Sequence, residues 1–448
     1  MNKYIAHLSL LIALLILSAC SSNKRISIDL MAAPEIYHEK MISPFNNTGP
    51  IDINDPFYIF YATDRQPAED IQHRPYYLPE RSHVLRLGRA KVKLGGGEYT
   101  WEETRDITLL KERSKKYPLS LRMVEEFGVL DSTIGAAKRL SLGAEVSAKP
   151  GMAYAAAINR RLASSSVKDI YIYTHGYKVH FDNPVLVSAE LHHFLGYQGV
   201  FIAYSWPATP SIWAYSSDLE TTRYTANDFR GFLQYLAENT DAERIHIIGY
   251  SAGTRVVIDA IWQLALLNQG ESKDALSEKF RIGQVLLMAS DYDRDSFVNT
   301  VSDRVLDIPD HTTIYLSETD KALGMSSWLL NRRRLGEIDR KEGGLTQEQI
   351  NTLAPNHNLS LINVSQAERA NSGKGHNYFR QSPWVSSDVL MTLRFALMPE
   401  ERGLIQEEGM GIWSYPPDYI QRLRESLYKK HANGDLQTMP KVPDEKGG

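Results

Sequence analysis

Cysteine is almost absent from this chain of 448 residues, because Cys20 is the single one in the sequence. A disulfide within the chain is therefore excluded, and so is a zinc site built from several thiolates. The fold has to be stabilised by a buried apolar core instead. The chain is long enough to form one large core.

The sequence also lacks an excess of positive charge. Its 50 Lys and Arg residues are outnumbered by 54 Asp and Glu residues, which gives a formal net charge of -4. Proteins that bind nucleic acids usually carry a basic field, so composition does not indicate a nucleic-acid partner.

A long apolar run is missing as well. The run near the N-terminus, from Leu8 to Leu17, is shorter than the roughly 20 apolar residues that a membrane-spanning helix needs. It follows Lys3 and is followed by small residues, a pattern that is typical of a secretory signal. We therefore expect an exported protein without a spanning helix in this segment.

The end of this segment, LSAC at residues 17–20, resembles the bacterial lipoprotein signal, in which the chain is cut before a cysteine that is then lipidated. We expect a signal peptide over residues 1–19 and a lipidated Cys20 with a tether over residues 20–55. Such an anchor would place the protein in the cell envelope, attached to a membrane without spanning it. The serine after the cysteine resembles the signal for the outer membrane, in a cell that has two membranes.

From about residue 168, short apolar runs alternate with segments of helical periodicity. This alternation predicts an α/β fold with a doubly wound, mostly parallel sheet. One of the helices is expected to start at Pro184, with Asp182 or Asn183 as its cap. Six strands are predicted, at residues 170–173, 200–204, 245–248, 285–288, 314–316 and 359–364.

The parts of the chain around this alternation are expected to extend the same domain, over residues 56–400. Two leading antiparallel strands are predicted at residues 58–62 and 85–94, and residues 105–165 are predicted to be helical. Residues 321–357 form a helical insertion that is positioned to act as a lid. A C-terminal helix and a polar tail are expected over residues 401–448. Asp64 and Arg65 are expected to form a buried ion pair that braces the first strand.

The stretch GYSAG at residues 249–253 matches G-x-S-x-G between a predicted strand and a predicted helix. In such a turn the serine, Ser251, projects its hydroxyl above the sheet, and the N–H of Ala252 lies at the positive end of the helix, where it can hold an oxyanion. The alternative is a tight turn that merely needs small residues. The motif therefore predicts a nucleophile only if a base and a carboxylate accompany it.

A serine becomes a nucleophile when a histidine removes its proton and a carboxylate orients that histidine. Asp320 follows the strand predicted at 314–316, and His376 lies in a glycine-containing loop after the last predicted strand. The order serine, aspartate, histidine along the chain is the one found in hydrolases whose nucleophile lies in a G-x-S-x-G turn. Three other acidic residues are alternatives to Asp320: Asp291, Asp293 and Glu318.

A second oxyanion donor is expected after the strand at 170–173, where the sequence reads HGYK. Gly176 would let the backbone approach a substrate, and the N–H of Tyr177 or of Lys178 would be the donor. His175 and His180 could be taken for a metal pair, but no further metal-ligand motif accompanies them. We therefore expect no metal and no cofactor.

On these residues the sequence resembles the α/β-hydrolase superfamily and, more narrowly, a bacterial esterase/lipase-like family of largely uncharacterised α/β-hydrolases. The likeness spans about residues 57–398 and implies a triad of Ser251, Asp320 and His376. Two departures are a tyrosine before the serine, where relatives often have histidine, and SD in place of PD at 290–291. The likeness rests on FYATDR (60–65), YTHGYKVHFDN (173–183), YSWPA (204–208), IIGYSAGTRVV (247–257), ASDYDRDSF (289–297), YLSETDKAL (315–323) and GHNYF with SPWVSSD (375–388).

The expected function is that of a membrane-anchored serine hydrolase, esterase- or lipase-like, which acts on a small-molecule or lipid ester. Two alternatives stay open. One is a non-catalytic envelope lipoprotein that uses the hydrolase scaffold for binding, because a fold does not guarantee a function. The other is a peptidase or transacylase with the same triad. The sequence indicates neither an acyl-chain length nor an oligomeric state.

Overall fold

The computed structural model describes residues 26–40, 42–45, 58–71, 73–95, 99–135, 147–338, 353, 356–408 and 411–433. The predicted signal peptide and Cys20 lie outside these residues, and so do the polar tail from residue 434 and most of the predicted insertion after residue 338. Within the described part of the chain, no helix has both the length and the apolar character that crossing a membrane requires.

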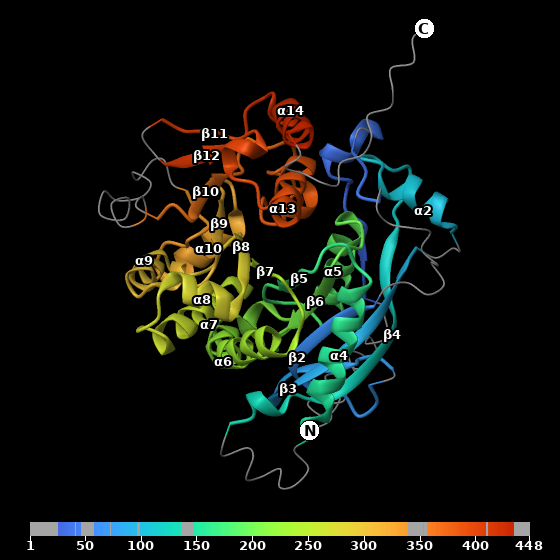
Figure 1. Cartoon of the computed structure of the whole chain (residues 1–448), viewed down its shortest axis with the longest axis vertical. Coiled ribbons are helices and arrows are strands. Elements are labelled where there is room, and N and C mark those ends of the chain that lie inside the picture. Colours follow the sequence, from blue (N-terminus) through green and yellow to red (C-terminus); the bar gives the residue numbers. More distant parts are fainter. Residues whose placement is uncertain are drawn as a thin grey trace, which may run out of the picture.

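One sheet runs through the centre of the described molecule (Figure 1). Its twelve strands lie in the order β1-β4-β3-β2-β6-β5-β7-β8-β9-β10-β12-β11. The strands are β1 (Ser27–Asp29), β2 (Ile59–Pro67), β3 (Tyr77–Leu94), β4 (Pro118–Val129), β5 (Ile170–Thr174), β6 (Val200–Ser205), β7 (Ile245–Tyr250), β8 (Ile282–Met288), β9 (His311–Leu316), β10 (Leu359–Asn363), β11 (Ile405–Gln406) and β12 (Ile412–Ser414).

The sheet is mostly parallel. The block from β2 through β6, β5, β7, β8, β9 and β10 to β12 pairs in parallel throughout. At one side β3, β4 and β1 continue it with antiparallel pairing, and at the other side β11 pairs antiparallel with β12. The predicted fold class, a doubly wound and mostly parallel sheet with antiparallel leading strands, is confirmed.

Helices cover both faces of the sheet (Figure 1). One face carries α4 (Lys149–Ala163), α6 (Tyr215–Asn239), α7 (Gly253–Leu267) and α8 (Lys273–Phe280), and the other carries α5 (Asp182–Phe194), α13 (Pro383–Phe395) and α14 (Tyr419–Ala432). The remaining helical elements are η1 (Glu35–Lys40), α2 (Trp101–Thr108), η2 (Asp131–Thr133), η4 (Ile212–Ala214), α9 (Arg294–Ser302), η5 (Val305–Asp307), α10 (Lys321–Leu330), α12 (Tyr378–Gln381) and η6 (Pro399–Arg402).

The central strands are buried on both sides, which explains their continuous apolar sequences. In β5, Ile170 and Ile172 belong to the core cluster under α4, α6 and α7, whereas Tyr171 and Tyr173 belong to the cluster under α5 and α13. Alternate side chains of one strand thus fill two separate cores.

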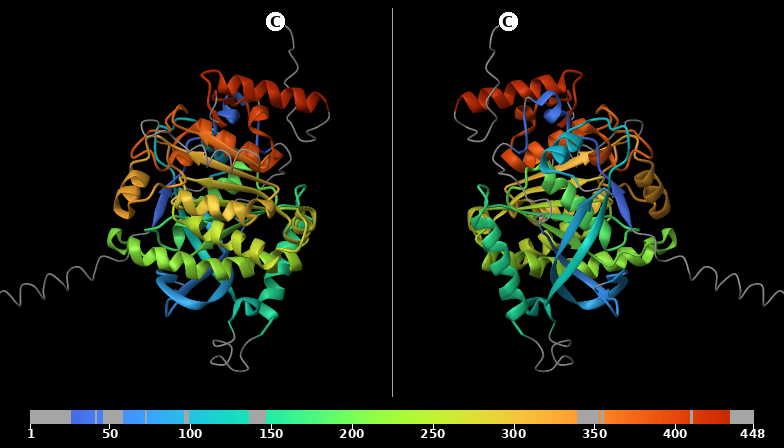
Figure 2. Two further views of the ribbon diagram at one scale, coloured as in Figure 1. Left: turned by 90° about the vertical axis from the view of Figure 1, so that its left-hand side faces the viewer. Right: turned by 90° about the vertical axis from the view of Figure 1, so that its right-hand side faces the viewer.

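Elements from the two ends of the described chain meet on one face. Near the start, η1 packs against α13 and α14 (Figure 2). The backbone N–H of Ile36 donates to the hydroxyl of Ser387 at 3.1 Å, and Ile36 and Tyr37 are buried. The C-terminal helix therefore completes a core that the N-terminal segment begins.

The prediction of a helical stretch over residues 105–165 is wrong in its middle. The described part of this stretch contains the end of α2, the strand β4 and all of α4. β4 pairs along its length with β3, and its apolar alternation is interrupted because the pairing shifts register twice. Charged side chains of the two strands also pair, as Arg86 does with Glu126 and Arg89 with Glu125. Because of these ion pairs, charged residues stand at positions where a regular alternation of apolar and polar residues would have apolar ones, so the strand was not recognised in the sequence.

The predicted cap of α5 is also wrong. The helix begins at Asp182, and its N-cap residue Phe181 makes no side-chain cap hydrogen bond. The carboxylate of Asp182 instead pairs with Arg74. The side chain of Asp182, which the preference for Asp at helix N-caps assigned to the helix end, thus forms a long-range ion pair instead.

Candidate active site

The carboxyl ends of the parallel strands bring three predicted residues together. Ser251 follows β7, Asp320 follows β9, and His376 lies in the segment after β10. Nε2 of His376 is 2.9 Å from Oγ of Ser251, and Nδ1 of His376 is 2.6 Å from Oδ2 of Asp320. The three side chains form one hydrogen-bonded chain, in the order that transfers a proton away from the serine.

Ser251 occupies a strained turn between β7 and α7. Its φ is 52°, in the left-handed region that residues with a Cβ seldom adopt. Gly253 is required there, since a Cβ at that position would lie 2.3 Å from the carbonyl oxygen of His175. The serine itself is only 4% exposed. The glycine thus allows a close contact with the loop after β5. A turn that merely needs small residues would share this feature, and it is the contact of Ser251 with His376 that distinguishes this turn.

Asp320 holds the histidine in one orientation. Its Oδ1 accepts hydrogen bonds from the N–H groups of Ala322 at 3.0 Å and Leu323 at 3.1 Å, as the N-cap of α10. Its other oxygen faces His376. A carboxylate can only accept, so Nδ1 of His376 carries the proton in this arrangement and Nε2 is left to accept from Ser251. Helix α10 therefore fixes the carboxylate, and the carboxylate fixes the tautomer.

The loop that bears His376 is held close to the loop that bears Asp320. Gly375 has a φ of 69°, and a Cβ on it would lie 2.8 Å from the carbonyl oxygen of Thr319. The N–H of Lys321 donates to the carbonyl of Lys374 at 3.1 Å. The ring of Tyr250 lies 5.2 Å from the imidazole of His376. The sequence showed a glycine-containing loop, but the need for Gly375 at this contact becomes visible only in the structure.

The three rival carboxylates bind elsewhere. Asp291 accepts from the hydroxyls of Tyr215 at 2.7 Å and Ser326 at 2.6 Å, and from Nε of Arg255 at 3.1 Å. Asp293 caps the start of α9, and Glu318 accepts from the side chain of Asn363 at 2.9 Å. Of the four candidate acids, Asp320 is the one that contacts His376.

The two expected oxyanion donors flank the serine. Ala252 is the N-cap residue of α7. Gly176 lies against the nucleophile, because a Cβ on it would be 2.9 Å from Cβ of Ser251, and Tyr177 comes next in the chain. In the described part of the chain, neither the N–H of Ala252 nor that of Tyr177 donates to a protein acceptor. Two backbone N–H groups without a protein acceptor among the described residues thus lie on segments that contact Ser251.

His175 has a structural setting. Its ring nitrogens lie 2.6 Å from the carbonyl oxygen of Gly176 and 3.1 Å from that of Trp206, and its ring stacks on the indole of Trp206. Complete burial and the nearby Arg65 hold the pKa of His175 well below its usual value. Within the described ranges, no group of three His, Cys, Asp or Glu side chains is gathered closely enough to hold a metal ion.

Arg65 braces the loops around this histidine in a way that differs from the expected ion pair with Asp64. Its buried guanidinium donates to Oγ of Ser205 at 3.0 Å and to the carbonyl oxygens of Ala208 and Val179 at 3.2 and 3.0 Å. Asp64 accepts from Thr225 instead. Burial lowers the pKa of Arg65 to about 10. The expected pair is replaced by a cation that ties the loop after β5 to the segment after β6.

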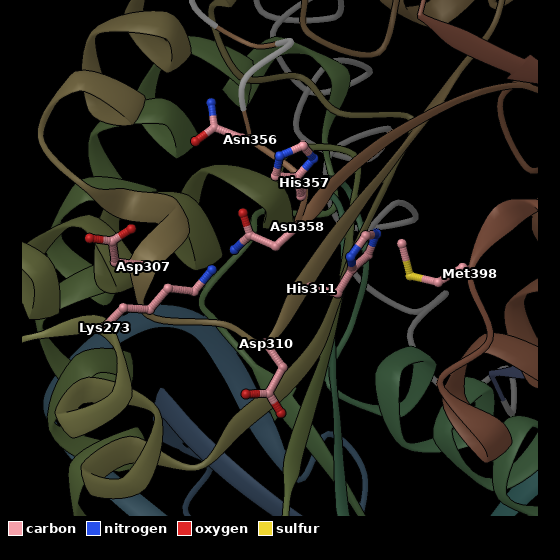
Figure 3. Close-up of a pocket in the computed structure, with 8 residues that line it drawn as sticks. All are labelled: Lys273, Asp307, Asp310, His311, Asn356, His357, Asn358 and Met398. Atoms are coloured by element: carbon pink, nitrogen blue, oxygen red, sulfur yellow. The ribbon is translucent and has the colours of Figure 1, made fainter.

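A polar cavity of about 400 Å³ lies away from this constellation (Figure 3). His311 is the first residue of β9, and Asn358 immediately precedes β10. The cavity is therefore at the amino ends of the strands, opposite to the end that bears Ser251. Its lining residues are Lys273, Asp307, Asp310, His311, Asn356, His357, Asn358 and Met398.

A comparison with protein families agrees with the fold. Residues 151–394 match a family model that is described as an alpha/beta hydrolase of unknown function (DUF900). A crystal structure of an inhibited esterase B from Lactobacillus rhamnosis is similar over 61% of this chain and 80% of that chain, with 12% sequence identity and a TM-score of 0.26. No curated protein matches the sequence.

Proposed function

The chain belongs to a family of α/β-hydrolases of unknown function, and from this premise we propose that it is a serine hydrolase that cleaves carboxylic esters. The observation that carries the proposal is the hydrogen-bonded chain from Ser251 through His376 to Asp320. A hydroxyl, an imidazole and a carboxylate in this order have the parts needed for acyl transfer.

In the first half of the proposed reaction, Oγ of Ser251 attacks the ester carbonyl while Nε2 of His376 takes the hydroxyl proton. The carboxylate of Asp320 stabilises the imidazolium that forms and keeps its own negative charge. His376 then gives the proton to the leaving alcohol, and an acyl group remains on Ser251.

The negative charge that develops on the carbonyl oxygen is assigned to the N–H groups of Ala252 and Tyr177. Support comes from the place of Ala252 directly after Ser251, from the contact of Gly176, which precedes Tyr177, with Ser251, and from the absence of a protein acceptor for either N–H among the described residues. Loss of one such donor costs about 3 kcal/mol of transition-state stabilisation in comparable sites.

In the second half, a water molecule gives a proton to Nε2 of His376 and attacks the acyl carbonyl. The acid is released and the proton returns to Ser251. A different acceptor in place of water would make the protein a transacylase, and an amide in place of the ester would make it a peptidase. The two halves of the reaction use the same groups in either case.

The proposal is tested by labelling the full chain with a fluorophosphonate, which reacts with activated serines. The wild type is compared with Ser251→Ala, with His376→Ala and with Ser217→Ala, which removes an exposed hydroxyl from α6. Labelling is expected in the wild type and in Ser217→Ala, absent in Ser251→Ala, and slowed by about 100-fold or more in His376→Ala.

Hydrolysis of p-nitrophenyl esters of increasing chain length then measures turnover and acyl preference. A folded wild type that neither labels nor hydrolyses any of these esters would contradict the proposal. That outcome would favour the alternative, a binding protein on a hydrolase scaffold.

We also propose that the mature chain is anchored in the cell envelope through a lipid on Cys20. This rests on the LSAC sequence at residues 17–20. Bacterial cells fed an alkynyl fatty acid are expected to label the wild type but not Cys20→Ser, and only the wild type should be processed after residue 19. Equal labelling of both proteins would refute the anchor and leave the hydrolase proposal untouched.

A further inference from the structure

Five large apolar side chains are exposed on the segments that follow β6 and β9. We call these five side chains the rim. Their exposed fractions are 90% for Trp213, 81% for Trp328, 58% for Met325, 55% for Leu329 and 53% for Ile212. Monomeric proteins usually scatter such residues singly. A group that includes two nearly fully exposed tryptophans therefore indicates a contact surface.

The two segments of the rim are joined to each other. Ile212 and Trp213 lie in η4, which runs directly into α6 at Tyr215, and the other three residues lie on α10. The hydroxyl of Tyr215 is 2.6 Å from that of Ser326 on α10. Both hydroxyls also bind Asp291. The rim is thus held together by one buried hydrogen-bond network.

The rim also borders the catalytic constellation. Helix α10 begins on Asp320, whose carboxylate contacts His376. On the other segment, the ring of Tyr215 packs edge-on against the ring of Tyr177, with centroids 5.3 Å apart. A molecule or surface that covers the rim therefore lies next to both Asp320 and Tyr177, whose N–H is an expected oxyanion donor.

The composition of the rim suits a lipid surface. Met325, Trp328 and Leu329 are spaced i, i+3 and i+4, so they share one face of α10, while Ser326 points into the protein. Amphipathic helices that lie in a membrane interface have such a face, and tryptophan is enriched at the boundary between headgroups and acyl chains.

The charges around the rim indicate an anionic lipid. The two rim segments, residues 209–217 and 321–336, contain no acidic residue. The acids that flank them directly accept hydrogen bonds within the protein: Asp218 from Thr209, Asp320 from Ala322, and Glu337 from Ser327. Lys321 and Arg332 are exposed at the two ends of α10. Basic residues near a membrane surface are attracted to anionic headgroups.

We infer that the rim docks the protein onto an anionic lipid surface, from which acyl esters reach Ser251. The inference deepens the proposed function and rests on it for the chemistry of the ester. It assigns the substrate class as esters that are embedded in a lipid aggregate. Docking itself does not need the reaction, so it is measured separately.

Docking is measured on the full chain with Ser251→Ala, so that no lipid is hydrolysed. Vesicles of phosphatidylglycerol and phosphatidylcholine with brominated acyl chains quench tryptophans that enter them. Quenching is expected with the parent and lost in the variant that also carries Trp213→Phe and Trp328→Phe. All variants share the N-terminal segment, so attachment through it cancels in the comparison. Unchanged quenching, or none in the parent, overturns the inference.

Catalysis at the surface is measured with Ser251 intact. The variant with Trp213→Ser and Trp328→Ser is compared with Met152→Ser plus Leu267→Ser, which removes two exposed apolar side chains far from the rim in sequence. The rim variant is expected to slow hydrolysis of vesicle-embedded p-nitrophenyl palmitate about tenfold more than hydrolysis of dissolved p-nitrophenyl acetate. The control variant should hydrolyse both esters at the wild-type rates, so the ratio between the two rates should also stay the same.

The outcomes separate the two proposals. If no ester is hydrolysed but the rim tryptophans are still quenched, the proposed function fails and docking stands. If the rim variant and the control variant hydrolyse embedded and dissolved esters in the same ratio as the wild type, the inference that docking through the rim brings esters to Ser251 is wrong. A wild type that is a dimer and a rim variant that is a monomer would assign the surface to a second copy of the chain. Equal docking on purely zwitterionic vesicles would refute the anionic preference.

Discussion

Gly176 and Ser251 are in direct contact across the candidate site. A Cβ on Gly176 would lie 2.9 Å from Cβ and 3.3 Å from Oγ of Ser251. The loop with the expected oxyanion donor is therefore packed on the nucleophile itself, and any side chain at this glycine has to move one of the two.

The contact predicts that Gly176→Ala lowers kcat/KM on a dissolved ester by about 100-fold or more, because the added methyl displaces Ser251 or the N–H of Tyr177 from the reacting carbonyl. Gly270→Ala is the matched control, since a Cβ there meets nothing within 4 Å. Ester kinetics and the thermal midpoint are measured for both. Wild-type kinetics in Gly176→Ala would mean that the loop is not part of the reacting geometry.

Asp320 and Glu318 lie two residues apart, but only the first contacts His376. Asp320→Asn is expected to lower kcat by about 10³- to 10⁴-fold, because an amide can present a donor to Nδ1 and favour the wrong tautomer. Glu318→Gln should stay within a few-fold of the wild type. Steady-state kinetics of both variants decide between the acids, and similar losses in the two would contradict the assignment.

Tyr215 connects the rim segments to Asp291, which also binds Arg255 at the start of α7. Tyr215→Phe removes this hydroxyl from buried partners and should lower the free energy of unfolding by about 1–2 kcal/mol. Tyr224→Phe is the control, because its hydroxyl contacts the exposed His83. Urea unfolding measures both. A destabilisation that is no larger for Tyr215→Phe would show that the network adds little to stability.

Acid should destabilise the fold in part through His311. Burial, with Arg402 and Lys273 nearby, lowers the pKa of His311 to about 4, whereas an unfolded histidine titrates near 6.5. Because the folded pKa is the lower one, this contribution to stability is complete above about pH 6.5 and is lost as the pH falls towards 4, with a slope of at most about 1.4 kcal/mol per pH unit.

His311→Gln is therefore expected to flatten the dependence of the urea midpoint on pH between about 6.5 and 4. His73→Gln is the control, because that side chain is 82% exposed. An unchanged slope in His311→Gln would assign the acid sensitivity to other groups.

The parallel strands could be predicted from the sequence because each is buried on both faces and reads as an apolar run, as IYIY in β5 and VFIAY in β6 do. β4 could not be, because its pairing with β3 shifts register and carries charged pairs, so no regular alternation survives. The short strands β11 and β12 lack a pattern of their own and depend on β10 for their pairing.

In the candidate site, order along the chain pointed to Ser251 and His376 and favoured Asp320, but it left Asp291, Asp293 and Glu318 open as the acid. The contact between Asp320 and His376 is visible only in the structure. The roles of the neighbouring acids were not readable in the same way. Asp291 follows the end of a parallel strand, β8, as a catalytic acid would. Only its contacts with Tyr215 and Ser326 show that its role differs from that of Asp320. Such contacts link segments far apart in the sequence, and no local pattern encodes them.

The packing of η1 against α13 and α14 has a consequence for the order of events in the cell. The N-terminal part of the fold cannot be completed until the last helix has been synthesised, and contacts between such distant segments form slowly. Until α14 is made, the buried side chains of Ile36 and Tyr37 in η1 lack part of the surface that covers them. Removal of α14 should therefore loosen η1 as well, although the two segments lie at opposite ends of the described chain.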